Sequence, residues 1–150
     1  MCRIRSLTGM PVICRRQKIG HLVQADLSDD LKRMEGIWVD SGLKGTRYIP
    51  AEQLGMIGRM AVIADSRGLR RRCSPKPLLH RAISTDGSRI GAIVGAEVDE
   101  LSFLVDFLEL SRGIWDDLAF GRIPVDRFSV QQGSVIVSAS TEANRKEDQP

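Results

Sequence analysis

The alternation of apolar and polar residues predicts short β-strands, and one strand pattern occurs twice in the chain. Residues Lys18–Leu27 (KIGHLVQADL) align without a gap with Arg89–Val98 (RIGAIVGAEV). In both segments apolar side chains recur with a period of two, as expected for a strand with one buried face. The alternation breaks at Leu22 and at the equivalent Ile93, which indicates a strand buried on both faces or bent by a bulge. A repeat of this kind predicts a duplicated fold.

The repeat extends over most of the chain. The offset between the copies is 71 residues at Lys18–Leu27 and 74 residues at Tyr48–Glu52, which aligns with Arg122–Asp126. The second copy has therefore gained three residues, and we expect them within Arg112–Phe120. Each copy is typical of a meander of short strands. The predicted strands are Pro11–Cys14, Lys18–Leu27, Met34–Asp40, Thr46–Ile49 and Met60–Ala64, then Arg81–Ser84, Arg89–Val98, Phe103–Leu110, Gly121–Ile123 and Ser134–Ser138.

Turn residues refine this pattern. Asp86-Gly87 predicts a tight hairpin turn, whereas the equivalent tip of the first copy carries Arg15-Arg16, which a tight turn does not require. Pro50 and Pro124 are each expected to end a strand, and the residues behind each of them are long enough for one helical turn.

The fold class predicted from these features is all-β, with two tandem small β-barrels of about five or six strands each. The repeats are residues 1–66 and 78–140, and a chain of 150 residues is long enough to bury their cores. Residues 67–77 contain Gly, Pro and several Arg with little apolar content, which indicates a basic linker. Residues 141–150 are polar and without periodicity, which predicts a disordered tail.

The two copies together resemble the PRC-barrel family. The resemblance covers nearly all of residues 5–65 and continues more weakly over 78–138, where Leu79–Ile83 departs from the usual Gly-x-x-Val opening. It implies a small closed β-barrel for each copy. The family includes the cytoplasmic domain of the photosynthetic reaction centre H subunit and the C-terminal domain of a ribosome maturation factor. Those members are adaptors without a shared catalytic residue. The residues that carry the resemblance are Leu7–Val12, Lys18–Gly20, Arg47–Leu54 and Ala61–Ile63.

The charge is distributed unevenly between the two halves. Residues 1–76 carry 15 Lys and Arg against 7 Asp and Glu, a net charge of +8, whereas residues 77–150 carry 7 against 12, a net charge of −5. We expect the two halves to attract each other, either within one chain or between the chains of a homo-oligomer.

Two basic groups and one tryptophan are the candidate partner-binding residues. The barrel pattern requires neither basic group, so they either solvate a linker and a loop tip or bind an acidic protein surface or an RNA backbone. Trp115 lies in the lengthened segment, where it either anchors a partner or folds back over the neighbouring barrel. The candidate residues are Arg15, Arg16, Lys18, Arg67, Arg70, Arg71, Arg72, Lys76 and Trp115.

Reactive chemistry has little support in the sequence. Cys2, Cys14 and Cys73 match neither zinc pairs nor a redox CxxC spacing, and neither His21 nor His80 lies in a nucleophile motif. We expect no enzyme activity, no metal and no cofactor. The first residues lack a continuous apolar core and no stretch approaches the roughly 20 apolar residues of a membrane span, so we expect neither a signal peptide nor a membrane span. The expected location is cytoplasmic.

The function predicted from these features is a non-enzymatic adaptor that binds a protein or ribonucleoprotein assembly. An RNA-binding module that acts through phosphate contacts is the alternative. Small-ligand binding in a pocket between the barrels comes third. The sequence alone does not name the partner.

Overall fold

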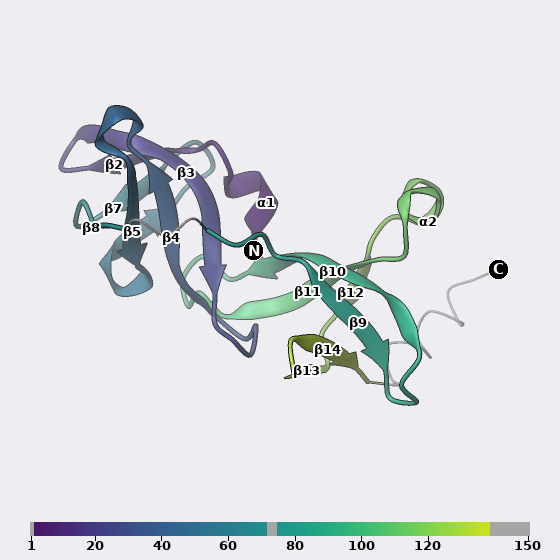
Figure 1. The fold of residues 1–150 in the computed structure, drawn as a ribbon. Helices are drawn as coiled ribbons and strands as arrows, with labels where there is room; N and C mark the ends of the chain where they lie inside the picture. The colour runs from purple at the N-terminus through teal and green to yellow at the C-terminus, as the bar shows by residue number, and fades with distance from the viewer. Residues whose placement is uncertain (1, 72–74, 139–150) are drawn as a thin grey trace. The chain divides into compact units, whose positions relative to one another are not determined.

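The computed structural model describes residues 2–71 and 75–138. Most of these residues lie in strands, which form two curled, barrel-like sheets (Figure 1). The chain divides into unit 1, residues 1–77 and 98–105, and unit 2, residues 78–97 and 106–150. The prediction of an all-β protein with two barrel-like units is therefore confirmed. Residues 72–74 and the predicted tail, 141–150, lie outside the described part of the chain.

Unit 1 is a sheet with the strand order β6-β7-β2-β3-β4-β5-β8. Strands β2 and β7 pair in parallel, and the other neighbouring strands pair antiparallel. Alternate residues of these strands point inward, and Val12, Ile37, Val39, Ile49 and Val62 are fully buried. The elements are β1 (Cys2–Arg3), α1 (Ile4–Leu7), β2 (Pro11–Cys14), β3 (Gln17–Leu27), β4 (Met34–Asp40), η1 (Gly42–Lys44), β5 (Thr46–Pro50), η2 (Ala51–Gln53), β6 (Leu54–Ile57), β7 (Val62–Ala64) and β8 (Leu69–Arg70).

Unit 2 follows the order β12-β11-β10-β9-β14-β13. Strands β9 and β14 pair in parallel, which matches the pairing of β2 with β7. Its core contains Ala82, Ile93, Leu108, Val125 and Val135. The elements are β9 (His80–Ser84), β10 (Arg89–Val98), β11 (Val105–Ser111), α2 (Ile114–Phe120), β12 (Ile123–Val125), β13 (Phe128–Gln131) and β14 (Ser134–Val137).

The two sheets repeat the same connectivity at the predicted offsets. The parallel pair Val12 and Val62 in unit 1 is equivalent to the pair Ile83 and Ile136 in unit 2. β6 at Leu54–Ile57 and β13 at Phe128–Gln131 are separated by 74 residues, as the repeat requires. The lengthened segment of the second copy forms α2, in the position where the first copy has the three-residue helix η1. The duplication read from the sequence is thus present in the strands.

The repeated Ile-Gly dipeptide marks a bulge followed by a close approach of two strands. In β3 the pairing with β2 skips Ile19, and in β10 the pairing with β9 skips the equivalent Ile90. A Cβ atom on Gly20 would lie 2.2 Å from the carbonyl oxygen of Asp40, and one on Gly91 would lie 2.3 Å from that of Ser111. Only glycine fits at these two points. A second bulge in β3 leaves Val23 unpaired with β4, so the broken alternation at Leu22 reflects a bent strand.

Three local predictions differ from the structure. Pro124 does not end its strand but lies inside β12. Proline is tolerated there because β12 is an edge strand, and the edge that faces away from β11 needs no backbone hydrogen-bond donor. Residues Val125–Phe128 do not form a helical turn, since Val125 ends β12 and Phe128 begins β13. Within the segment interpreted as a linker, Leu69–Arg70 form β8, which pairs with β5.

Residues 98–105 belong to unit 1, although they lie inside the second repeat by sequence. Their loop pairs with the equivalent loop of the first repeat. The Met34 amide donates to the Phe103 carbonyl at 2.8 Å, and the Val105 amide donates to the Lys32 carbonyl at 2.8 Å. At the offset of 71 residues, Met34 is equivalent to Val105 and Lys32 to Phe103. The contact is therefore reciprocal: each loop donates one of these hydrogen bonds and accepts the other.

Candidate binding surfaces

The hairpin between β2 and β3 holds two arginines at its tip. Cys14 pairs with Gln17, which leaves a loop of only two residues, Arg15 and Arg16. Both have positive φ angles, 51° and 67°, as in a type I′ turn, where Asn and Gly are preferred. The left-handed conformation costs roughly 1–2 kcal/mol for each such residue. Two exposed arginines are therefore held at this tip against their backbone preference.

Arg67 extends the basic group at this tip. Its Nη2 donates to the Gln17 Oε1 at 2.7 Å, although the two residues are 50 positions apart in sequence. Gly68, with φ of +67°, lies where an added Cβ would be 2.3 Å from the Tyr48 carbonyl oxygen. The close fit at Gly68 fixes the chain directly after Arg67 against β5. The structure thus brings the start of the predicted linker next to the tip arginines.

Arg70 and Arg71 continue this surface along β5. Arg70 pairs with Arg47 across β5 and β8, and the Arg71 amide donates to the Thr46 carbonyl at 3.1 Å. The Arg71 guanidinium carbon lies 4.4 Å from the centre of the Tyr48 ring, a cation–π distance. Arg71 is therefore ordered by an aromatic ring rather than by a carboxylate.

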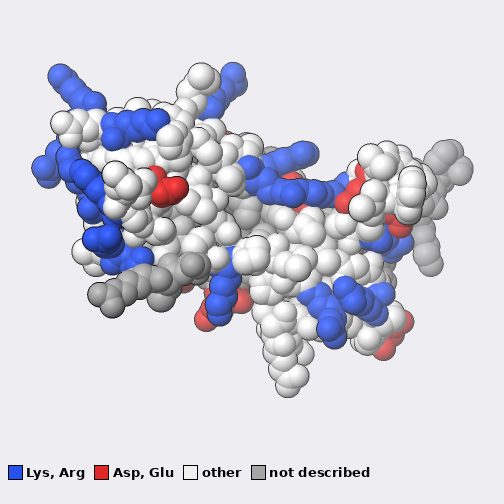
Figure 2. Space-filling model, turned by 45° about the horizontal axis from the view of Figure 1, so that its top comes forward, with Lys and Arg blue, Asp and Glu red and all other residues white. Residues whose placement is uncertain are grey.

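We define the basic surface as Arg15, Arg16, Lys18, Arg47, Arg67, Arg70 and Arg71. Figure 2 shows Lys and Arg side chains gathered over unit 1, at the left of the view. None of the seven side chains forms an ion pair with another described residue. A surface of this kind attracts polyanions.

The remaining predicted basic residues fit this surface less well. Lys76 is held through its backbone, since the Gln24 side-chain amide donates to its carbonyl. Arg72 lies outside the described residues. Sequence reasoning missed Arg47, because its place beside Arg70 depends on the pairing of β5 with β8, a tertiary contact that no local pattern indicates.

A second candidate surface is helix α2 of unit 2, which stands away from the strands of that unit (Figure 1). Asp117 of this helix is turned toward its unit: the Ser111 hydroxyl donates to the Asp117 Oδ2 at 2.7 Å, and the Arg122 Nε lies 3.8 Å from the same oxygen. Arg122 also contacts the buried Glu109 through its Nη1 at 3.2 Å. These contacts attach α2 to its unit through charged and polar groups.

The apolar side of α2 faces solvent. Trp115 is 84% exposed, so its indole is not part of a core. Ile114, Leu118 and Phe120 are exposed to 70% or more. This arrangement inverts the usual orientation of a surface helix, whose apolar face is turned toward the core. Exposed apolar patches of several hundred Å² mark interaction sites.

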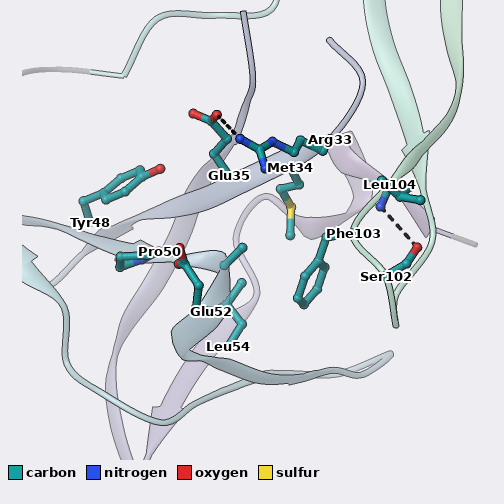
Figure 3. A pocket seen from close by; sticks show the side chains of 11 residues that line it. Arg33, Met34, Glu35, Tyr48, Pro50, Glu52, Leu54, Ser102, Phe103 and Leu104 are labelled. Atoms are coloured by element: carbon teal, nitrogen blue, oxygen red, sulfur yellow. Dashed lines mark hydrogen bonds and ion pairs between the residues drawn. The ribbon is translucent and has the colours of Figure 1, made fainter. Parts of the chain in front are cut away.

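Unit 1 also contains an open pocket of about 680 Å³ (Figure 3). Its apolar floor includes Met34, Leu54 and Phe103, and its rim carries Arg33 and Glu35, which pair at 3.4 Å. The rim cation is thus already neutralised by a carboxylate. The lining residues are Arg33, Met34, Glu35, Tyr48, Pro50, Ala51, Glu52, Leu54, Ser102, Phe103 and Leu104.

Tyr48, on the wall of this pocket, is kept in its neutral form. Burial and the hydrogen bond from its hydroxyl to the Asp26 Oδ2 at 2.8 Å raise the pKa of Tyr48 above its ordinary value of 10. A tyrosine in this state donates a hydrogen bond but is not available as a base.

The residues considered for reactive chemistry do not converge in the described part of the chain. Cys14 is buried opposite Gln17, whereas His21 lies farther along the same hairpin, opposite Pro11. The imidazole Nδ1 of His80 is 3.2 Å from the Gly133 carbonyl oxygen. Cys73 lies outside the described residues. Among residues 2–71 and 75–138, no group of three or more His, Cys, Asp or Glu is arranged to hold a metal ion.

Comparisons with known proteins do not assign this chain to a family. No protein-family model matches the chain, and no curated protein shows significant similarity to it. Among the described residues, no helix is long and apolar enough to cross a membrane.

Proposed function

We propose that the protein is a non-enzymatic, cytoplasmic adaptor built from two PRC-barrel-like units, and that it binds an acidic protein or ribonucleoprotein assembly through the basic surface. The observation that carries this proposal is the convergence of separate chain segments on one unneutralised surface. The β2–β3 tip, β5 and the segment around β8 contribute seven cations without a carboxylate partner among the described residues.

The local structure of the tip supports a functional role for its arginines. An Asn-Gly dipeptide in place of Arg15 and Arg16 would suit the two-residue turn better, since both positions have positive φ. Strain of this kind is found where a side chain serves a purpose other than stability. Arginine suits an acidic or phosphorylated partner because its planar guanidinium donates in parallel to carboxylate or phosphate oxygens.

The experiment uses a variant that removes charge without weakening the hairpin. Arg15→Asn and Arg16→Gly supply the residues that the turn prefers, and Arg67→Gln keeps a side chain of similar reach. We expect this triple variant to keep or raise the melting temperature and to lose the partners that the wild-type chain recovers from native lysate. The charge-matched control, Arg81→Ser with Arg89→Ser and Arg127→Ser, removes three exposed cations from unit 2. Equal recovery of all partners by the triple variant and the wild type would refute the proposal.

RNA binding through phosphate contacts is the second candidate, favoured by the same surface because no described carboxylate competes with a phosphate for its cations. Treatment of the lysate with ribonuclease separates the two functions, since partners held through RNA are lost and partners held through protein remain. With a purified single-stranded RNA, each lost phosphate contact lowers the slope of log K against log salt by about 0.7. The triple variant should therefore reduce that slope by about 2 if all three arginines contact phosphate.

A further inference from the structure

We propose that Arg71 is a base-stacking residue, and that the basic surface of unit 1 takes single-stranded RNA with one nucleobase laid on the Arg71 guanidinium. This inference rests on the RNA-binding candidate given above for the same surface. It names the feature of that surface that separates RNA from other polyanions. The feature is the way in which Arg71 is held, rather than its charge.

The strand pairing of unit 1 holds Arg71 over two aromatic rings. Its amide donates to the Thr46 carbonyl at 3.1 Å, which continues the register of β5 and β8 by one residue. Thr46 and Tyr48 lie on the same face of β5, so Arg71 is the diagonal cross-strand neighbour of Tyr48. The guanidinium carbon lies 4.4 Å from the centre of the Tyr48 ring and 6.0 Å from the centre of the Trp38 ring. The strand register thus positions a guanidinium on an aromatic ring.

The two rings beneath Arg71 are themselves fixed. Trp38 and Tyr48 meet edge to face with ring centres 5.0 Å apart, and each residue is only 8% exposed. The Tyr48 hydroxyl donates to the Asp26 Oδ2 at 2.8 Å, which anchors the ring and occupies the carboxylate. Among the described residues, no acceptor takes a hydrogen bond from the Arg71 side chain and no carboxylate pairs with it. Arg71 is therefore ordered while its donors stay free for a ligand.

A guanidinium with one face on a ring offers its other face to a planar ligand. Arg71 is an exposed residue, and the bases of single-stranded RNA stack on arginine guanidinium planes. Leu69, two residues earlier, lies on the same side of the strand and is 72% exposed. A carboxylate gains nothing from an apolar neighbour, whereas the ring of a nucleobase can contact the leucine and the guanidinium together. These neighbours favour RNA over an acidic protein surface.

The cations beside Arg71 are placed to meet the phosphates of the same RNA strand. β8 is the last strand of its sheet, and both of its residues are exposed. Arg70 points to the other side of the strand from Arg71, and it pairs with Arg47 of β5. The Arg70 guanidinium lies against Gly45, where an added Cβ would be 3.3 Å from the Arg70 Nε. A nucleotide chain that follows this edge has a stacking site on one side and phosphate contacts on the other.

The test compares three probes on the full-length chain by fluorescence anisotropy. They are an oligouridine RNA of about eight nucleotides, an abasic RNA with the same number of phosphates, and a glutamate peptide of equal charge. We expect the oligouridine to bind about five- to tenfold more tightly than the abasic strand, because stacking of a single base contributes at least about that factor. The glutamate peptide should bind no more tightly than the abasic strand.

A lysine at position 71 separates stacking from charge. Arg71→Lys keeps the charge but removes the planar face, and the exposed position leaves the fold intact. We expect this variant to bind oligouridine about fivefold more weakly and the abasic strand within about twofold of the wild type, so that the preference for bases is lost. Arg70→Lys is the matched control, since it changes the adjacent exposed arginine in the same way. It should affect both nucleic-acid probes alike and keep the preference.

The outcomes distinguish this inference from the proposed function. Equal oligouridine affinity of the wild type and Arg71→Lys, or equal affinity of the wild type for the oligouridine and the abasic strand, would overturn the stacking role while RNA binding stands. A chain that binds none of the probes, or that binds the glutamate peptide most tightly, would overturn both the stacking role and RNA binding. The adaptor function would still be decided by the lysate experiment, because its triple variant leaves Arg71 unchanged.

Discussion

Gly20 provides a direct test of the duplicated fold, because its equivalent Gly91 has the same structural role in the other unit. In the Gly20→Ala variant the new Cβ would lie 2.2 Å from the Asp40 carbonyl oxygen and 2.9 Å from the Val39 Cγ1. Backbone atoms cannot rotate away from such a contact. The variant must therefore separate β3 from β4 or distort the bulge at Ile19.

The expected cost follows from this contact. Overpacking in a well-packed region costs typically 1–3 kcal/mol, and a backbone neighbour places Gly20→Ala toward the upper end, at about 2–3 kcal/mol. For a unit of this size each kcal/mol lowers the melting temperature by about 4–8 °C. Gly91→Ala meets the Ser111 carbonyl oxygen at 2.3 Å and also has a φ of +156°. We expect it to cost about 1 kcal/mol more, because alanine is strained at that angle.

Thermal and urea unfolding followed by circular dichroism measure both variants, and amide hydrogen exchange shows which unit is destabilised. Gly55→Ala is the matched control, since its Cβ would lie 3.1 Å from the Asp65 Oδ1, a side-chain atom that can move. We expect the control to stay within about 0.5 kcal/mol of the wild type. A Gly20→Ala chain as stable as the control would show that the close approach of β3 and β4 is not required.

The other predictions concern ionisation and the attachment of α2. Tyr48 is the only tyrosine of the chain, so tyrosinate absorbance reports its titration directly. Its folded pKa is raised above the unfolded value of 10, so the stability that it contributes is present below pH 10 and is lost as the pH rises toward the folded pKa; Tyr48→Phe should remove this alkaline loss. The hydroxyls of Ser84 and Ser88, with the Ser88 amide, lower the pKa of Asp86 from 3.8 to about 2, so its contribution to stability is present above pH 3.8 and is lost as the pH falls toward 2. A carboxyl NMR titration of Asp86 with a midpoint near 3.8 would contradict this. Asp117→Ala should speed amide exchange throughout α2 while changing the free energy of unfolding by less than about 1 kcal/mol, since the contacts it loses are partly exposed. Unchanged exchange in α2 would show that other contacts hold the helix.

The strands and the duplication could be predicted because they depend on local pattern. Alternation located β3 and β10, and the change of offset from 71 to 74 residues placed the added residues in the segment that forms α2. The type I′ turn at Arg15-Arg16 could not be predicted from residue preference, because arginine rarely adopts positive φ. Here the pairing of β2 with β3 outweighs the preference of the turn residues.

The candidate sites depended more on tertiary contacts. The two basic groups were found in the sequence, but their convergence depends on the bond from Arg67 to Gln17 across 50 positions. The position of Trp115 in the lengthened segment of the second copy made it a candidate without giving the direction of its side chain. The inward turn of Asp117 toward Ser111 and Arg122 sets that direction, and in so short a helix no pattern of apolar residues could have given it.

The reciprocal contact between the two loops limits where the chain can change length. Each loop supplies the hydrogen-bond partner of the other, from Met34 to Phe103 and from Val105 to Lys32, so a residue inserted into either loop would shift both ends of the contact. The copies keep their offset of 71 residues through this contact and as far as the Gly91 contact with Ser111. Only after Ser111 do the copies diverge in length, at the site of α2. New residues, and with them a new surface, could be added there without disturbing the strands that the repeats share.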